Sequence, residues 1–131
     1  MMQDRYLFRG KTISGDWVQG LLASTDGKWY ISNKAGKPFA YEIRPESICQ
    51  CTGLKDKNGN LIWENDIVAY WDSYSTENGL AEADCIGKVV WDDETISFQV
   101  TNRLSAESYE VLDDECSVIG NTFDNPELLE V

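Results

Sequence analysis

The sequence predicts a mostly β fold with one or two short helical turns. Its strand-favouring runs are short, turn residues separate them, and the longest uninterrupted apolar run, residues 67–71, has only five residues. Short strands with regular turns are typical of a small barrel or sandwich. At 131 residues the chain has the size of one domain, and its five tryptophans predict a core anchored by aromatic side chains.

Four short strands are predicted in the N-terminal part, separated by segments rich in Gly, Asp and Ser. Ser14, Gly15 and Asp16 separate the first two strands by only three residues, so these strands are expected to form a hairpin. A second turn falls at residues 25–28, and a loop at residues 33–38. The predicted strands are residues 5–13, 17–22, 29–32 and 39–43.

A second hairpin is predicted between residues 85–91 and residues 96–100. Its loop, residues 92–95, has four residues, which is one of the commoner hairpin lengths. Clean alternation in the second strand places three apolar side chains on one face: Ile96, Phe98 and Val100.

The segments on either side of this hairpin are less regular. Residues 67–71 form a predicted strand, whereas residues 72–84 are polar and acidic without a pattern, which predicts a loop between neighbouring strands. In residues 104–114 helical and extended readings compete, and we expect no more than a short helical turn there. A closing strand at residues 117–120 is followed by a last helical turn, with Asn125 as its cap and Pro126 at its first position.

Charge is distributed unevenly along the chain. Residues 1–60 carry nine Lys or Arg and six Asp or Glu, whereas residues 61–131 carry two and 17. Because Lys and Arg make most phosphate contacts, so acidic a surface is expected to repel nucleic acids and anionic membranes. The acidity either serves solubility alone or forms a face that engages a basic protein, for example by imitating nucleic acid. The candidate interaction surface comprises Asp72, Glu77, Glu82, Asp84, Asp92, Asp93 and Glu94.

The N-terminus predicts a protein of the cytoplasm. It mixes charges of both signs and holds no apolar segment of signal-peptide length, and no apolar run approaches the length of a membrane span. Cysteines in a chain without a secretion signal are expected to be reduced thiols.

The four cysteines predict neither a metal site nor a disulfide. Cys49 and Cys51 form a Cys-x-Cys pair, with Cys85 and Cys116 far away in the sequence. Zinc sites more often use tighter loop spacings such as Cys-x₂-Cys, and a disulfide between residues i and i+2 of a strand is sterically awkward. Buried or edge thiols, with no metal and no cofactor, are the expectation.

The composition argues against an enzyme. The chain has no histidine, which removes the usual general base near neutral pH and the Ser-His-Asp and Cys-His arrangements. It also has no P-loop and no dinucleotide-binding fingerprint. Carboxylate pairs occur at residues 92–94, at residues 113–115 and at Glu64 with Asp66, but charge runs at turns are usually solvated. A carboxylate-dependent hydrolase or nuclease using Glu64 and Asp66 is therefore the alternative.

A weak nucleic-acid-binding module is a further alternative. Arg5, Arg9 and Lys11 interleave with aromatic residues in the slightly basic first 60 residues. The net charge of the whole chain, −12, argues against this interpretation.

Three segments carry a family resemblance. The first contains Phe8 to Gly10 and, at residues 17–20, Trp-Val-Gln-Gly. The second contains Thr-Gly-Leu-Lys-Asp-Lys-Asn-Gly at residues 52–59 and Ile-Trp-Glu-Asn-Asp-Ile-Val at residues 62–68. The third contains Val-Ile-Gly-Asn at residues 118–121 and Asp-Asn-Pro-Glu-Leu-Leu at residues 124–129. Together these segments resemble the YopX proteins of phages and prophages.

The resemblance implies a fold and a setting, but no chemistry. The implied fold is a single domain over residues 1–131, with an N-terminal β-hairpin region (residues 1–49) packed on a small SH3-like barrel with a C-terminal tail (residues 50–131). The implied setting is the cytoplasm of a bacterial host. Two positions depart from the family, which usually has Gly in place of Asn65, and a small residue and an aromatic in place of Cys49 and Cys51.

The residue types of the central segment predict a structural role for it. Asp56 to Gly59 fit a tight turn, since Asn and Gly tolerate positive φ, and Trp63 would anchor the following strand. Asn is the next-best residue after Gly for a left-handed conformation, so Asn65 is predicted to adopt one. The predicted structural motif is Gly53, Asp56, Gly59, Trp63, Asn65 and Asp66. The expected function is that of a non-enzymatic accessory protein that acts through a protein partner or as a homo-oligomer.

Overall fold

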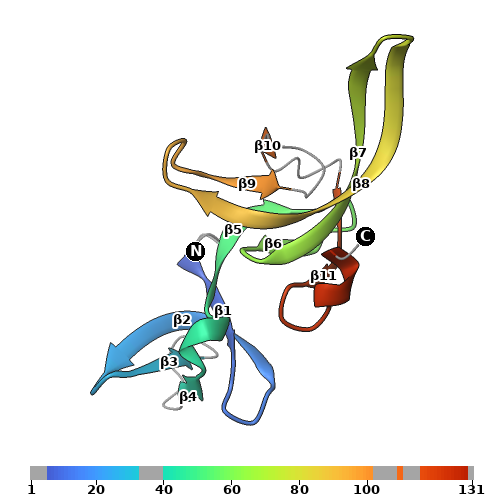
Figure 1. Cartoon of the computed structure of the whole chain (residues 1–131). Helices are drawn as coiled ribbons and strands as arrows, with labels where there is room; N and C mark the ends of the chain where they lie inside the picture. Colours follow the sequence, from blue (N-terminus) through green and yellow to red (C-terminus); the bar gives the residue numbers. More distant parts are fainter. Residues whose placement is uncertain (1–5, 33–39, 102–108, 111–115, 130–131) are drawn as a thin grey trace. The chain divides into compact units, whose positions relative to one another are not determined.

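The computed structural model describes residues 6–32, 40–101, 109–110 and 116–129 (Figure 1). Over these ranges the chain is all-β, with antiparallel sheets and two short 3₁₀ turns, which confirms the predicted fold class. The chain forms two compact units, residues 1–54 and residues 55–131, described separately below. That the chain behaves as a single domain stays a prediction.

The first unit is an antiparallel sheet in the order β4-β3-β2-β1-β5. The 3₁₀ turn η2, Pro45–Ser47, connects β4 to β5. Its buried core contains Ile31, Ile43, Cys49 and Cys51. The strands are β1 (Phe8–Lys11), β2 (Trp17–Thr25), β3 (Lys28–Ser32), β4 (Ala40–Ile43) and β5 (Cys49–Lys55), the last of which ends at the division between the units.

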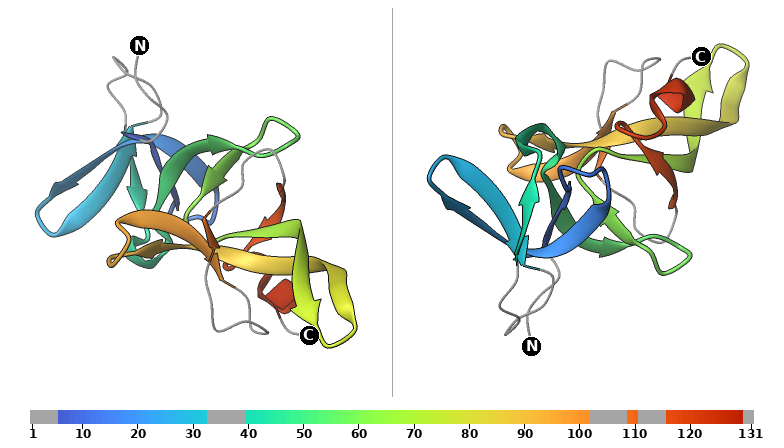
Figure 2. Two further views of the ribbon diagram at one scale, coloured as in Figure 1. Left: turned by 90° about the horizontal axis from the view of Figure 1, so that it is seen from above. Right: turned by 90° about the horizontal axis from the view of Figure 1, so that it is seen from below.

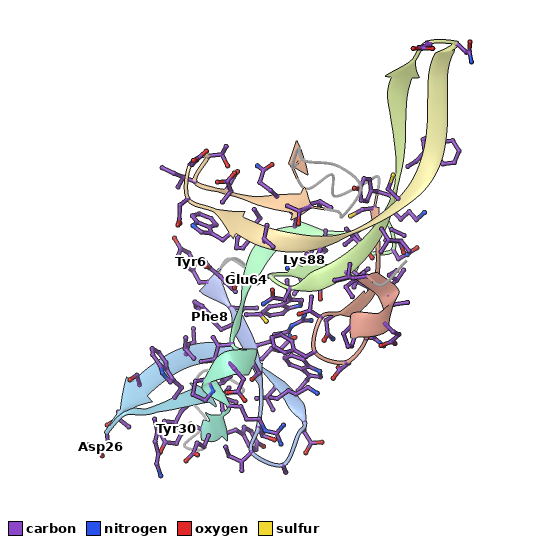
Figure 3. All side chains as sticks on the ribbon, viewed as in Figure 1. Tyr6, Phe8, Asp26, Tyr30, Glu64 and Lys88 are labelled. Carbon is purple, nitrogen blue, oxygen red and sulfur yellow. The ribbon has the colours of Figure 1, made fainter. Side chains whose placement is uncertain are left out.

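Local turn chemistry sets the hairpins of this unit. The predicted β1–β2 hairpin is confirmed, with Lys11 opposite Trp17. β2 runs on to Thr25, further than predicted, and a two-residue turn joins it to β3. Both turn residues, Asp26 (φ 52°) and Gly27 (φ 77°), are left-handed, as type I′ hairpin turns require. Figure 3 shows Asp26 at the tip of this hairpin and Tyr30 on its second strand. The loop predicted at residues 33–38 lies outside the described residues.

The second unit holds an antiparallel sheet in the order β10-β9-β8-β7-β11. Its core consists of Ile62, Val68, Val89, Val100 and Cys116, with Tyr70, Phe98 and Val118 packed against them. The elements are β6 (Leu61–Trp63), β7 (Asp66–Thr76), β8 (Gly79–Asp92), β9 (Ser97–Thr101), β10 (Tyr109–Glu110), β11 (Cys116–Asn121) and the 3₁₀ turn η4 (Pro126–Leu129).

The prediction of a loop over residues 72–84 is wrong. β7 and β8 form one long hairpin that stays in register from Ile67 opposite Lys88 to Thr76 opposite Gly79 (Figure 1). Backbone pairing needs no apolar pattern, so the polar side chains concealed the strands. A usable signal was present, because Asn78-Gly79 is the dipeptide most typical of hairpin turns.

The β8–β9 hairpin is confirmed with a shift of one residue. Asp92 pairs with Ser97, so the four-residue loop is residues 93–96. Ile96 therefore lies in the loop with φ 53° and is 74% exposed, whereas the sequence predicted it on the apolar face of the strand. The register of the hairpin overrode the alternation at this position.

Two further expectations about this unit change. The predicted closed SH3-like barrel is not confirmed, because the described strands of this sheet form a linear order with β10 and β11 at the edges.

The tryptophans do not jointly anchor a core as predicted. Trp63 is buried, but Trp71 and Trp91 are exposed, and so is Trp29 in the first unit. The core of the second unit consists mainly of β-branched Ile and Val side chains, together with the Cys116 thiol.

The predicted closing strand and last helical turn are confirmed, but the Asn125 side chain does not cap that turn as predicted, because its Oδ1 accepts from the Asn121 N–H at 3.3 Å. The closing strand is β11, and the last helical turn is the 3₁₀ turn η4, whose first hydrogen bond runs from the Leu128 N–H to the Asn125 carbonyl at 3.1 Å. Residues 104–114 lie mostly outside the described residues, but residues 109–110 are extended in β10 rather than helical.

Candidate functional site

The Asp56 turn opens the second unit and is organised by one carboxylate. Asp56 Oδ1 accepts hydrogen bonds from the backbone N–H groups of Asn58 and Asn60, both at 2.9 Å. The Asp56 N–H in turn donates to the Asn60 carbonyl at 2.8 Å, and Gly59 takes the positive φ of 84° that lets the turn close. This local pattern is the Asx turn that Asp and Asn favour.

The same carboxylate ties the turn to the closing strand. Asp56 Oδ2 accepts a hydrogen bond from the Val118 N–H at 2.8 Å, across 62 positions of sequence. Alongside it, the Lys57 N–H donates to the Cys116 carbonyl at 3.0 Å, and the Asn58 amide donates to Ser117 Oγ at 3.1 Å. The turn therefore covers the edge of β11 that faces away from β7.

Asp56 is stabilised as a charged group. The side chain is buried, and burial raises the pKa of its carboxyl. The hydrogen bonds from the N–H groups of Val118, Asn60 and Asn58, together with the Asn60 amide, outweigh that effect and hold the pKa below its usual value. With its pKa held low, the Asp56 carboxyl is ionised near neutral pH, and its hydrogen bonds give it a structural role.

The Glu64–Asn65 corner is the second part of the motif. Asn65 has φ 69°, the left-handed conformation predicted from the sequence. Its N–H donates to the Val89 carbonyl at 2.8 Å, and its carbonyl accepts from the Thr122 N–H at 2.9 Å. Asp66, 1% exposed, accepts from the Trp63 N–H at 2.8 Å and so closes the corner. Figure 3 shows Glu64, which is half-buried, at this corner.

These segments coincide with those that carry the resemblance, and the whole-chain comparison agrees. A family model described as YopX protein matches residues 10–130. The chain belongs to the YopX family. No curated protein matches it.

In this YopX member, the described contacts of the central segment are structural: they form turns and join strands. Asp56 and Gly59 lie in the turn before β6, Trp63 ends β6, Asn65 follows it and Asp66 begins β7. Gly53 lies on β5 with φ 84° in the other unit. The left-handed backbone of Asn65 fits the Gly that the family usually has at this position.

The acidic residues predicted as an interaction surface fall into two groups. Asp92, Asp93 and Glu94 lie at the β8–β9 loop, and Glu77 lies in the β7–β8 turn with Asp72, Glu82 and Asp84 on the strands beside it. Asp92 is the last residue of β8, whereas Glu82 and Asp84 lie nearer its start. Eight residues separate Asp84 from Asp92, which at about 3.3 Å per residue is roughly 26 Å of strand.

The β8–β9 loop presents carboxylates to solvent. Asp92 accepts from the Glu94 N–H at 2.9 Å, and Asp93 accepts from the Trp91 indole N–H at 2.8 Å. Asp93 and Glu94 are exposed, and Trp91, itself 43% exposed, packs edge-on against Phe98 with ring centroids 5.1 Å apart. Each hydrogen bond spans only two residues, so the loop is held locally and its charges stay on the surface.

The cysteines do not assemble a site in the described part of the chain. Cys49, Cys51 and Cys116 are buried thiols, as predicted, and Cys85 is half-buried. Among the residues with described positions, no group of three or more Cys, Asp or Glu side chains gathers as metal ligands would. None of the described helical segments has the length and apolar character needed to cross a membrane.

Two basic residues of the first unit, Arg9 and Lys11, contact an aromatic ring. The Arg9 guanidinium lies 4.9 Å from the centre of the Trp17 ring, and Lys11 Nζ lies 5.4 Å from it. Such contacts stabilise both cations against the ring. Arg5, the third cation of the predicted basic segment, lies outside the described residues.

Proposed function

We propose that this YopX member is a non-enzymatic accessory protein, encoded by a phage or prophage, that acts in the bacterial cytoplasm through protein–protein contacts. Family membership suggests a phage-type protein. In this proposal, exposed carboxylates of the second unit engage a basic host protein.

The observation that carries the proposal is the division of charge between the two units. Residues 55–131 carry 18 Asp or Glu and four Lys or Arg, whereas residues 1–54 carry five and seven. Glu77, Asp93 and Glu94 of the acidic unit are exposed. A field of one sign steers a partner of the opposite sign and speeds their association.

The motif carboxylates support a role without catalysis. A general acid or base has to come within hydrogen-bonding reach of the reacting atom. Asp56 and Asp66 are buried and already accept backbone N–H groups, so they are poorly placed for a substrate. Of the two carboxylates in the hydrolase or nuclease alternative, Glu64 is more exposed than Asp66. The variants Glu64→Gln and Asp66→Asn test this alternative directly. Loss of a measurable activity with retained stability would favour it.

The test of the proposal is capture from a host lysate with two forms of the protein. The first is the native chain, and the second carries Glu77→Gln, Asp93→Asn and Glu94→Gln, exposed positions where neutralisation leaves the fold intact. We expect a basic protein to be retained by the native chain at low salt, released at high salt and lost with the variant, because salt screens exposed charges. A captured protein that is retained equally at low and high salt and by both forms of the chain would reject the proposal. Light scattering on the same sample gives the oligomeric state.

A further inference from the structure

β7 and β8 extend beyond their sheet as a two-stranded arm, residues 71–84. Among the described residues, the pairing of β7 with β11 ends at Tyr70, and the pairing of β8 with β9 ends at Lys88. The two strands continue together for six more register pairs, from Trp71 opposite Asp84 to Thr76 opposite Gly79. Figures 1 and 2 show this arm projecting from the rest of its sheet.

The arm offers strand edges to a partner. Within the described ranges, β11 and β9 are the outer neighbours of β7 and β8, and neither reaches the arm. A strand edge presents a row of backbone N–H and C=O groups that can accept another strand. A two-stranded ribbon in water is only marginally stable, so a third strand would stabilise this one.

The acidic charge of the arm influences which kind of strand can pair with its edge. Its sequence contains Asp72, Glu77, Glu82 and Asp84 and no Lys or Arg. Like charges on neighbouring strands are destabilising, so pairing with the arm of a second copy is disfavoured, whereas a strand rich in Lys or Arg is favoured. We therefore expect the acidic residues to disfavour pairing with a second copy and to favour a basic strand.

The base of the arm adds an aromatic contact. Trp71 is 53% exposed, and Ala69, two residues before it on β7, lies opposite Ile86, which is 37% exposed. Residues i and i+2 of a strand share a face, so Trp71 and Ile86 border one apolar surface. Trp71 is opposite Asp84 in the strand register. An exposed tryptophan ring in an acidic segment suits a Lys or Arg side chain, because the ring attracts the cation.

We propose that the arm binds an extended, basic segment of a protein partner by strand addition. The partner's backbone would pair with an edge of residues 71–84, its Lys or Arg side chains would face the arm's carboxylates, and one cation would lie on Trp71. Main-chain hydrogen bonds supply affinity in this mode and side chains supply specificity. The inference rests on the proposed function and assigns it a location and a mode of binding.

The experiment uses the full chain and a synthetic peptide of alternating lysine and threonine, with binding measured by calorimetry. Two arm variants are compared with the native protein. One replaces residues 73–82 by Asn-Gly, which closes Asp72 and Ala83 with a type I′ turn. The other keeps the arm and carries Asp72→Asn, Glu77→Gln, Glu82→Gln and Asp84→Asn. We expect each to weaken binding by about tenfold or more, which corresponds to about 1.4 kcal/mol.

Controls separate strand addition from general charge attraction. Asp93→Asn with Glu94→Gln removes two carboxylates far from the arm and should leave binding within about twofold. The same peptide methylated at every backbone nitrogen keeps its charges but cannot donate, and it should not bind. Hydrogen exchange should show new protection of the arm's backbone amides when the unmodified peptide binds.

The outcomes distinguish this inference from the proposed function. Binding that survives arm replacement but is lost with Asp93→Asn and Glu94→Gln would overturn the arm as the site while keeping an acidic interaction surface. Equal binding of the methylated peptide would overturn strand addition in favour of charge alone. Failure of the native protein to bind the basic peptide at low salt would overturn the arm as a site for a basic strand, whereas the lysate capture decides the proposed function separately.

Discussion

Two segments of the second unit have similar residue types but differ in their hydrogen bonds and burial. The segment from Asp56 to Asn65 and the β8–β9 loop each contain carboxylates and one left-handed residue that is not glycine. In the first, Asp56 is buried and bonded to a strand 62 positions away, and the Asn65 backbone is bonded on both sides. In the second, Asp92 and Asp93 bond only two residues away, and the left-handed residue is the exposed Ile96.

The difference shows how the same residue types can serve structure or remain available for binding. A carboxylate that satisfies distant backbone groups holds elements together and is withdrawn from solvent. A carboxylate that satisfies its own turn leaves the rest of its charge on the surface. Mutations at matched positions of the two turns should therefore have very different effects.

The largest expected effect is that of Asp56→Ala. The substitution leaves the N–H groups of Asn58, Asn60 and Val118 without their acceptor in a buried setting. We expect a loss of about 3 kcal/mol in the free energy of unfolding, since hydrogen bonds to charged groups are among the stronger ones. Denaturant unfolding measures it, with Asp93→Ala as the matched control; equal losses for the two variants would refute the contrast.

The second prediction concerns pH and follows from the lowered pKa of Asp56. Its folded pKa lies below the unfolded value, so its contribution to stability is present above the unfolded pKa and is lost as pH falls through the folded pKa. The stability gap between the native protein and Asp56→Asn should therefore be widest near neutral pH and shrink below about pH 4. A gap that stays constant across this range would contradict the assigned role of the charge.

Asn65→Ala should destabilise the protein by about 1 kcal/mol, because Ala pays more than Asn for a left-handed backbone. Asn65→Gly should keep the stability within about 0.5 kcal/mol, since Gly adopts this φ freely. The comparison of the two denaturant midpoints is the measurement. An unchanged midpoint for the alanine variant would reject strain at this corner.

Ile96→Gly should have the opposite sign. A β-branched residue at φ 53° is strained, and its side chain is 74% exposed, so little packing is lost when it is removed. A gain of about 0.5–1 kcal/mol in unfolding free energy is expected. Ile96→Val, which keeps the β-branch, is the control and should show no gain; a loss with glycine would mean that the isoleucine makes contacts that stabilise the loop.

The smallest effect on stability is expected for Asp93→Asn combined with Glu94→Gln. Both side chains are exposed, and the Trp91 indole can still donate to the amide oxygen at position 93. The unfolding free energy should stay within about 0.5 kcal/mol, as for most surface substitutions. A much larger loss, measured by thermal melting beside Asp56→Ala, would show that this loop too is structural.

Local chemistry made part of this molecule predictable from the sequence alone. Turns depend on the φ preferences of a few adjacent residues, so the hairpin at Ser14 to Asp16, the turn at Asp26 and Gly27 and the left-handed corner at Asn65 follow from residue type. The all-β class follows from the same punctuation, and the family follows from the motifs that contain these turns.

Tertiary structure alone decided the rest. Nothing near Asp56 in the sequence indicates that its carboxylate bonds to Val118, because that bond depends on how β11 meets the turn. Residues 72–84 form strands because they continue the register of the hairpin that begins at the apolar residues near Ile67. Their own polar side chains do not indicate a strand. The exposure of Trp71 and Ile96 has the same origin: position in the sheet, more than residue type, determines which apolar side chains are buried.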